Sequence, residues 1–136
     1  MKNITNVLEY LERSAQRFPD KPAYIDVNGS YTFSELERAA RAVGSALCGV
    51  LEKGCPAAVY MEKGVQQIAA FLGVAYAGGF YSPIDVDMPA PRVKLILETL
   101  EAEVVISDSR NAQKIRDMNY TGTIYVFDEI EQTEID

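Results

Sequence analysis

The sequence contains no histidine, and its two cysteines, Cys48 and Cys55, stand seven residues apart. Without histidine these residues can build neither a Cys/His zinc site nor a cysteine–histidine nucleophile. Histidine is also the commonest general base, and no tyrosine or lysine has a neighbour that would activate it as a nucleophile. The residues alone therefore form no complete catalytic site, and we expect the two thiols to be buried or idle.

Clusters of basic residues and long apolar runs are also missing. The chain has 13 basic and 20 acidic side chains, which gives a formal net charge of −7. Without clustered lysine and arginine there is no electrostatic footprint for nucleic acid or for a membrane surface. The longest apolar windows are too short and too rich in glycine to span a bilayer, and the N-terminus lacks the apolar core of a signal peptide. We expect a cytoplasmic protein with no nucleic-acid or membrane partner.

The first part of the chain predicts a helix, a hairpin and a second helix. Apolar residues at helical spacing between positions 4 and 18 predict an N-terminal amphipathic helix that ends before Pro19. Two short β-prone runs around Asn28-Gly29 predict a hairpin, with both residues at the positive φ of its turn. A helix with apolar positions from Leu36 to Leu51 follows. Its start is a capping box, in which Thr32 and Glu35 satisfy each other's amides and Tyr31 packs on Leu36.

From Ala57 onward, short apolar runs alternate with helical segments. Strands are expected at 57–61, 81–84, 104–107 and 123–127, with helices at 65–77, 92–100 and 111–118 between them. This order predicts an α/β fold with a mostly parallel sheet and flanking helices. The helix at 65–77 is apolar nearly all round, which predicts burial between two layers.

The length and composition fit a single domain over residues 1–136. The chain is 48% hydrophobic and 24% charged, as is typical of globular proteins. Residues 128–136 carry five acidic side chains and no basic one, so we expect a solvated acidic tail there.

The glycines match the spacing of a phosphate-binding loop only superficially. Gly44–Gly49, Gly49–Gly54 and Gly73–Gly78 all have the G-x-x-x-x-G spacing, but none is followed by Lys-Ser or Lys-Thr. We interpret Gly78 and Gly79 instead as a helix C-cap, where glycine adopts a left-handed conformation at little cost.

An acidic residue follows each expected strand, namely Glu62, Asp85, Asp108 and Asp128. One hypothesis is a free-standing α/β binding module, or a receiver-like or phosphatase-like one, with a Mg²⁺-binding acidic pocket around Asp85 and Asp87. A receiver also needs a lysine at the end of a late strand, and none stands there. The alternative is that Asp87, before Pro89, and Asp108 stand at helix N-termini, where capping and the helix dipole favour acids.

Two stretches resemble the adenylate-forming (AMP-binding) enzyme superfamily, especially amino-acid adenylation domains of non-ribosomal peptide synthetases and D-alanine ligases. "YTFSEL" resembles the first core motif of that family, and "AYAGGFYSPIDVDMPAPR" resembles the second. Tyr76 stands where a lysine is usual, and Val86 replaces a common proline. The matching residues are Tyr31, Thr32, Glu35 and Leu36 in the first motif, and Gly78, Tyr81, Pro83, Asp85, Pro89 and Arg92 in the second.

The resemblance implies that the chain is the N-terminal segment of the large N-terminal domain of such an enzyme. Both motifs are largely architectural in that family. The phosphate loop, the ribose-binding aspartate, the acyl pocket and the catalytic lysine belong to later segments, so we expect no catalytic, cofactor-binding or metal-binding residue here and no activity of the chain alone.

For the full-length enzyme the resemblance implies ATP and Mg²⁺ and an acyl-adenylate that is transferred to a thiol. The implied partners are the remainder of the adenylation domain and a phosphopantetheine carrier protein. Because missing layers would leave apolar surface exposed, we also expect the chain to self-associate.

Overall fold

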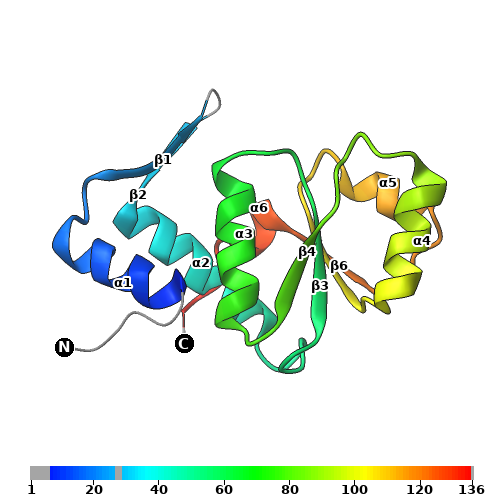
Figure 1. The fold of residues 1–136 in the computed structure, drawn as a ribbon, viewed down its shortest axis with the longest axis horizontal. Coiled ribbons are helices and arrows are strands. Elements are labelled where there is room, and N and C mark those ends of the chain that lie inside the picture. Colours follow the sequence, from blue (N-terminus) through cyan, green and yellow to red (C-terminus); the bar gives the residue numbers. More distant parts are fainter. Residues whose placement is uncertain (1–6, 27–28, 136) are drawn as a thin grey trace.

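The computed structural model describes residues 7–26 and 29–135, which form two sheets and their flanking helices (Figure 1). The helices are α1 (Val7–Arg17), α2 (Phe33–Leu47), α3 (Val65–Tyr76), α4 (Ala90–Leu100), α5 (Ala112–Asp117) and α6 (Phe127–Ile130). The strands are β1 (Pro22–Asp26), β2 (Gly29–Thr32), β3 (Pro56–Tyr60), β4 (Phe80–Pro83), β5 (Val104–Ser107) and β6 (Thr123–Val126).

The larger sheet has four parallel strands in the order β4-β3-β5-β6, and the strands β1 and β2 form a separate antiparallel hairpin. Figure 1 shows α2 and α3 on one side of the larger sheet, with α4 and α5 on the other. The α/β fold predicted from the alternation of strands and helices is confirmed. None of the described helices has the length and apolarity needed to cross a bilayer.

Two hydrophobic cores lie on the two faces of this sheet. On β3, Val59 belongs to the core under α2 and α3, whereas its neighbour Tyr60 belongs to the core under α4 and α5. Successive side chains of a strand point to opposite faces, so one strand serves both cores. The central strands β3 and β5 are consequently buried on both sides.

Helices α2 and α3 approach each other closely through two glycines. A Cβ built on Gly44 would lie 2.8 Å from Tyr76 Cβ, and one built on Gly73 would overlap Val43. Gly44 and Gly73 are therefore needed for helix packing. Their G-x-x-x-x-G spacing gives no indication of this role. The burial predicted for α3 is only partly correct: Ala69, Ala70 and Val74 are buried, but Ile68 and Phe71 stay half-buried.

Two further expectations need correction. Gly29 is not a turn residue, because it belongs to β2 and pairs with Asp26, while Asn28 lies outside the described residues. The expected solvated tail begins with α6, where Ile130 is only 8% exposed and joins the core under α2. The apolar residues of this segment anchor it, and the carboxylates of Asp128 and Glu129 remain in solvent. Cys48 is exposed and Cys55 half-buried, and both are free thiols.

Candidate functional site at the carboxyl edge of the sheet

The first core motif forms the start of α2. Glu35 N–H donates to Thr32 Oγ1 at 3.1 Å, and Thr32 N–H donates to Glu35 Oε1 at 3.0 Å. The Thr32 N–H that donates to the Glu35 carboxylate is the main cause that lowers the pKa of Glu35. Leu36 is buried in the core, and Tyr31 is half-buried against the same cluster. The polar groups of this motif are thus used to cap the helix, as the spacing predicts.

The first half of the second motif carries the chain from α3 into the edge strand β4. Gly78 has a φ of 86° and follows the last turn of α3, which confirms its predicted role at the helix end. The Tyr81 ring stacks on Phe71 of α3, with ring centroids 4.4 Å apart. Pro83 ends β4, where it lacks an N–H for further pairing.

The second half of this motif is the turn that leads into α4. Asp85 Oδ1 accepts a hydrogen bond from Asp87 N–H at 2.8 Å, which closes a turn. Pro89 is the N-cap residue of α4, and Arg92 lies exposed in the first turn of the helix. The carboxylate of Asp85 therefore orders the loop.

Tyr76, which departs from the family's lysine, links three helices. Its hydroxyl donates to Glu12 Oε1 at 3.0 Å, and the Arg41 guanidinium lies 5.1 Å from the ring centroid. Arg41 also donates to the same Glu12 oxygen at 3.0 Å. Burial, followed by the bond to Glu12, raises the pKa of Tyr76, so the phenol stays neutral. Tyr76 and Arg41 together supply the donors to Glu12.

The place where this sheet topology would receive a ligand is the crevice between the carboxyl ends of β3 and β5. The chain leaves β3 toward β4 on one side and leaves β5 toward β6 on the other, so the strand order reverses there. Glu62 follows β3, and Asp108 and Asn111 follow β5. Sequence reasoning included the two acids but missed Asn111, although its place three residues after Asp108 is a capping signal.

Asp108 fills this crevice with its own carboxylate. Its Oδ2 accepts the Glu62 N–H at 2.9 Å, and its Oδ1 accepts the Asn111 N–H at 2.7 Å. The Asn111 side-chain amide donates to both Asp108 oxygens, at 2.9 and 3.1 Å, and to Glu62 Oε1 at 3.2 Å. Asp108 is 9% exposed and Asn111 is 1% exposed, so the network is buried. Asp108 therefore closes the turn before α5 and does not cap the helix itself, because the N-cap residue of α5 is Asn111 and no described side chain caps this helix.

The acids at the strand ends do not converge on a metal site. The Asp85 carboxylate accepts the Asp87 N–H, and Asp128 accepts a hydrogen bond from Ser109 Oγ at 3.0 Å. Across residues 7–26 and 29–135 no three His, Cys, Asp or Glu side chains are grouped so that they could hold a metal ion. The Mg²⁺ pocket hypothesised around Asp85 and Asp87 is therefore not retained.

The residues of this edge do not suit the phosphates of ATP either. The amides of Glu62 and Asn111 are already bonded to Asp108, and Asn111 Oδ1 is a buried acceptor without a partner among the described residues. Of the described residues, three carboxylates, Glu62, Asp85 and Asp87, and one basic side chain, Lys63, line the adjoining hollow of about 400 Å³. An unpaired acceptor and a surplus of carboxylates would repel an anion. No nucleotide chemistry follows from these residues.

Comparison with known proteins defines the class as adenylate-forming enzymes. The profile described as "AMP-binding enzyme" matches residues 11–135. Tyrocidine synthase 1 of Brevibacillus parabrevis is 34% identical over 128 residues, which cover 91% of this chain and 12% of that protein. The D-alanine–D-alanyl carrier protein ligase of Listeria innocua serovar 6a is 32% identical over 104 residues, which cover 75% of this chain and 20% of that ligase.

Solved structures agree with this class. The non-ribosomal peptide synthetase FmoA3, in its alpha-methyl-L-serine-AMP bound form, superposes with a TM-score of 0.85 and 34% identity, covering 98% of this chain and 15% of that one. The chain belongs to the AMP-binding enzyme family. It spans between 12% and 20% of the length of the two relatives named above.

Proposed function

We propose that the chain is the N-terminal portion of an ATP-dependent ligase that activates an amino acid as an acyl-adenylate and transfers it to a thiol. The observation that carries the proposal is the family match over residues 11–135, which includes both core motifs. The named relatives, a peptide synthetase and a carrier protein ligase, support an amino acid as the substrate class. In the full-length enzyme, bound ATP and Mg²⁺ would supply the adenylyl group.

Within this enzyme the chain would act as scaffold. The ten motif residues would position α2, α3, β4 and α4 for the remainder of the adenylation domain, which would bring the groups that bind nucleotide and acyl substrate. The partner for thiol transfer would be a carrier protein with a phosphopantetheine arm. Two observations support a scaffold role: the motif's polar side chains bond to the chain's own backbone, and Asp108 fills the crevice at the strand-order reversal.

The chain by itself would be inactive, and it would reside in the cytoplasm. It would also self-associate, because edge strand β4 presents aromatic side chains to solvent: Phe80 is 49% exposed and Tyr81 is 45% exposed. Light scattering after size-exclusion chromatography measures this directly. A monomer at all concentrations would refute self-association while leaving the ligase proposal intact.

ATP–pyrophosphate exchange tests the ligase proposal. The 136-residue chain and a longer protein that includes the downstream coding sequence are each assayed with the amino acids one at a time. We expect no exchange with the chain alone and exchange with one amino acid, or a few, for the longer protein. Failure of the longer, folded protein with all amino acids would refute amino-acid activation.

A further inference from the structure

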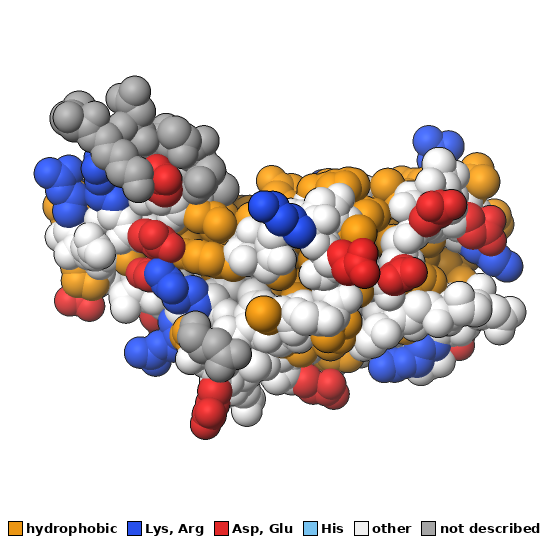
Figure 2. All heavy atoms as spheres, turned by 90° about the horizontal axis from the view of Figure 1, so that it is seen from below, with side chains coloured by type: hydrophobic (Ala, Val, Ile, Leu, Met, Phe, Trp, Pro, Cys, Tyr) orange, Lys and Arg blue, Asp and Glu red, His pale blue; other side chains and the backbone are white. Residues whose placement is uncertain are grey.

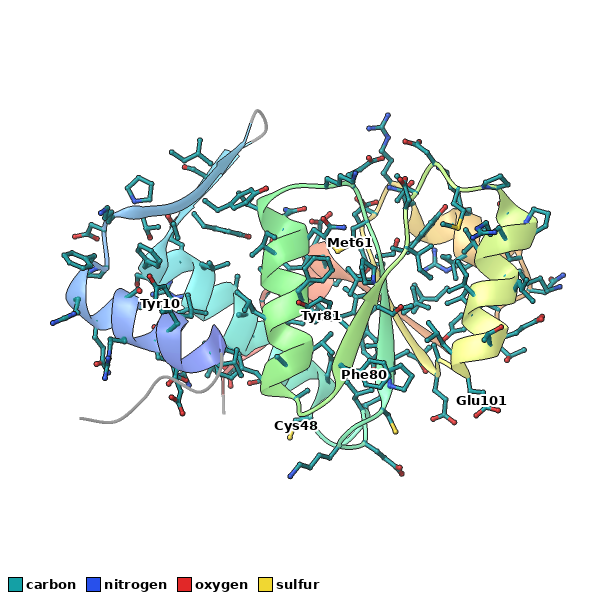
Figure 3. The ribbon with its side chains drawn as sticks, viewed as in Figure 1. Tyr10, Cys48, Met61, Phe80, Tyr81 and Glu101 are labelled. Atoms are coloured by element: carbon teal, nitrogen blue, oxygen red, sulfur yellow. The ribbon has the colours of Figure 1, made fainter. Side chains whose placement is uncertain are left out.

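A hollow of about 330 Å³ lies at the amino edge of the sheet, at the opposite end of the strands from Asp108. It is formed between the C-terminal end of α4 and residues 118–121, which connect α5 to β6. Figure 3 labels Glu101 at this end of the molecule. Figure 2 looks onto this face from below, and on its right half acidic, basic and hydrophobic side chains lie next to one another.

The floor of the hollow is apolar. Leu97 and Ala102 belong to the core under α4, and Met118 and Tyr120 are half-buried against that core. The Tyr120 hydroxyl donates to the Ala102 carbonyl at 2.8 Å, so this donor is already used. Burial, and secondarily Glu103, raises the pKa of Tyr120 to about 12, which keeps the hydroxyl neutral. The floor therefore favours the apolar part of a ligand.

The rim of the hollow is acidic. Glu98, Glu101 and Glu103 are exposed, and none of the three forms an ion pair with another described residue. Among the described residues of the lining, Lys94 is the one basic side chain. Helix α4 ends here without a basic residue in its last turn, so the partial negative charge of its C-terminus adds to the carboxylates. The rim favours a cation.

We propose that this hollow is a docking site for an amphipathic segment of a partner polypeptide that carries lysine or arginine. Those side chains combine an aliphatic stem, which suits the floor, with a charged head, which suits the three glutamates. A bare metal ion does not fit, because the described residues contain no cluster able to hold one. The hollow is the size of a small ligand pocket, which accommodates side chains rather than a whole helix. Docking there would leave the carboxyl edge of the sheet accessible.

Fluorescence anisotropy tests this proposal with a labelled short amphipathic peptide that carries leucine and lysine. The triple variant Glu98→Gln, Glu101→Gln and Glu103→Gln is expected to bind this peptide about tenfold more weakly, which is the combined effect of three surface ion pairs. Replacing leucine by serine in the peptide should also weaken binding, because the apolar floor loses its contact.

A matched variant separates this site from general electrostatic attraction. The triple variant Asp20→Asn, Glu129→Gln and Glu134→Gln removes the same charge from exposed positions elsewhere and should bind the peptide within about twofold of wild type. Thr121→Lys, which adds an ammonium beside the rim, should weaken binding without removing a carboxylate. Equal weakening by the two triple variants, or no saturable binding by the wild type, would overturn the proposal.

Discussion

The contact between α2 and α3 gives the most specific prediction about stability, through the substitution Gly73→Ala. A Cβ at this position would overlap Cβ and Cγ1 of Val43, and it would lie 3.0 Å from the carbonyl oxygen of Ala40. Val43 is fully buried, and as a β-branched residue it has little freedom at χ1. The overlap can be relieved only if the two helices move apart.

Two opposing effects set the magnitude. Alanine is a better helix former than glycine, which would stabilise α3 by about 1 kcal/mol. Overpacking a rigid contact costs about 1–3 kcal/mol or more, and here the overlap involves atoms next to the backbone on both helices. We expect the steric cost to exceed the gain and the free energy of unfolding to fall by about 2 kcal/mol.

Urea denaturation followed by far-ultraviolet circular dichroism measures this change. Gly29→Ala is the matched control, because a Cβ at Gly29 meets no atom within 4 Å. This control should change the free energy of unfolding by less than about 0.5 kcal/mol. If Gly73→Ala were as stable as the wild type, the close approach of α2 and α3 described here would be wrong.

Three further predictions concern hydrogen bonds. Thr32→Ala removes the N-cap of α2 and should lower the free energy of unfolding by about 1 kcal/mol in the same denaturation experiment. The pKa of Glu35 is lower in the folded state than its ordinary value of 4.5. The ionised Glu35 carboxylate therefore contributes its full stabilisation above pH 4.5, and this contribution is lost as the pH falls through the folded-state pKa. The stability difference between wild type and Glu35→Gln should therefore shrink on acidification, and an unchanged difference in pH-dependent denaturation would contradict this. Asp108→Ala leaves the amides of Glu62 and Asn111 unpaired and should lower the free energy of unfolding by about 3 kcal/mol. Hydrogen exchange should become faster at both amides. Unchanged exchange would argue against the Asp108 network.

Local signals in the sequence predicted much of the fold. The capping box needs only residues three apart, and both of its hydrogen bonds form. The alternation of strands and helices predicted a parallel sheet because parallel strands require long crossover connections. Gly78 was identified as a helix end for a similarly local reason, since its positive φ is a property of one residue.

Contacts between distant residues could not be predicted in this way. Asn111 and Glu62 are 49 positions apart, and nothing in either segment indicates that they form a hydrogen bond. The overlap that makes Gly73 necessary depends on Val43 in another helix. The acids at the strand ends were correctly noticed, but their hydrogen-bond partners decide whether they bind a metal or cap a turn, and those partners become visible only in the fold.

The most direct test of the central claim, that this chain is a scaffold without its own nucleotide site, is titration of Mg-ATP into the isotope-labelled chain, followed by NMR. We predict that the amide resonances of Glu62, Asp108 and Asn111 stay unchanged, because the Asp108 carboxylate already occupies the donors at this edge. Saturable shifts of these resonances would contradict the account, since they would place nucleotide binding within these residues.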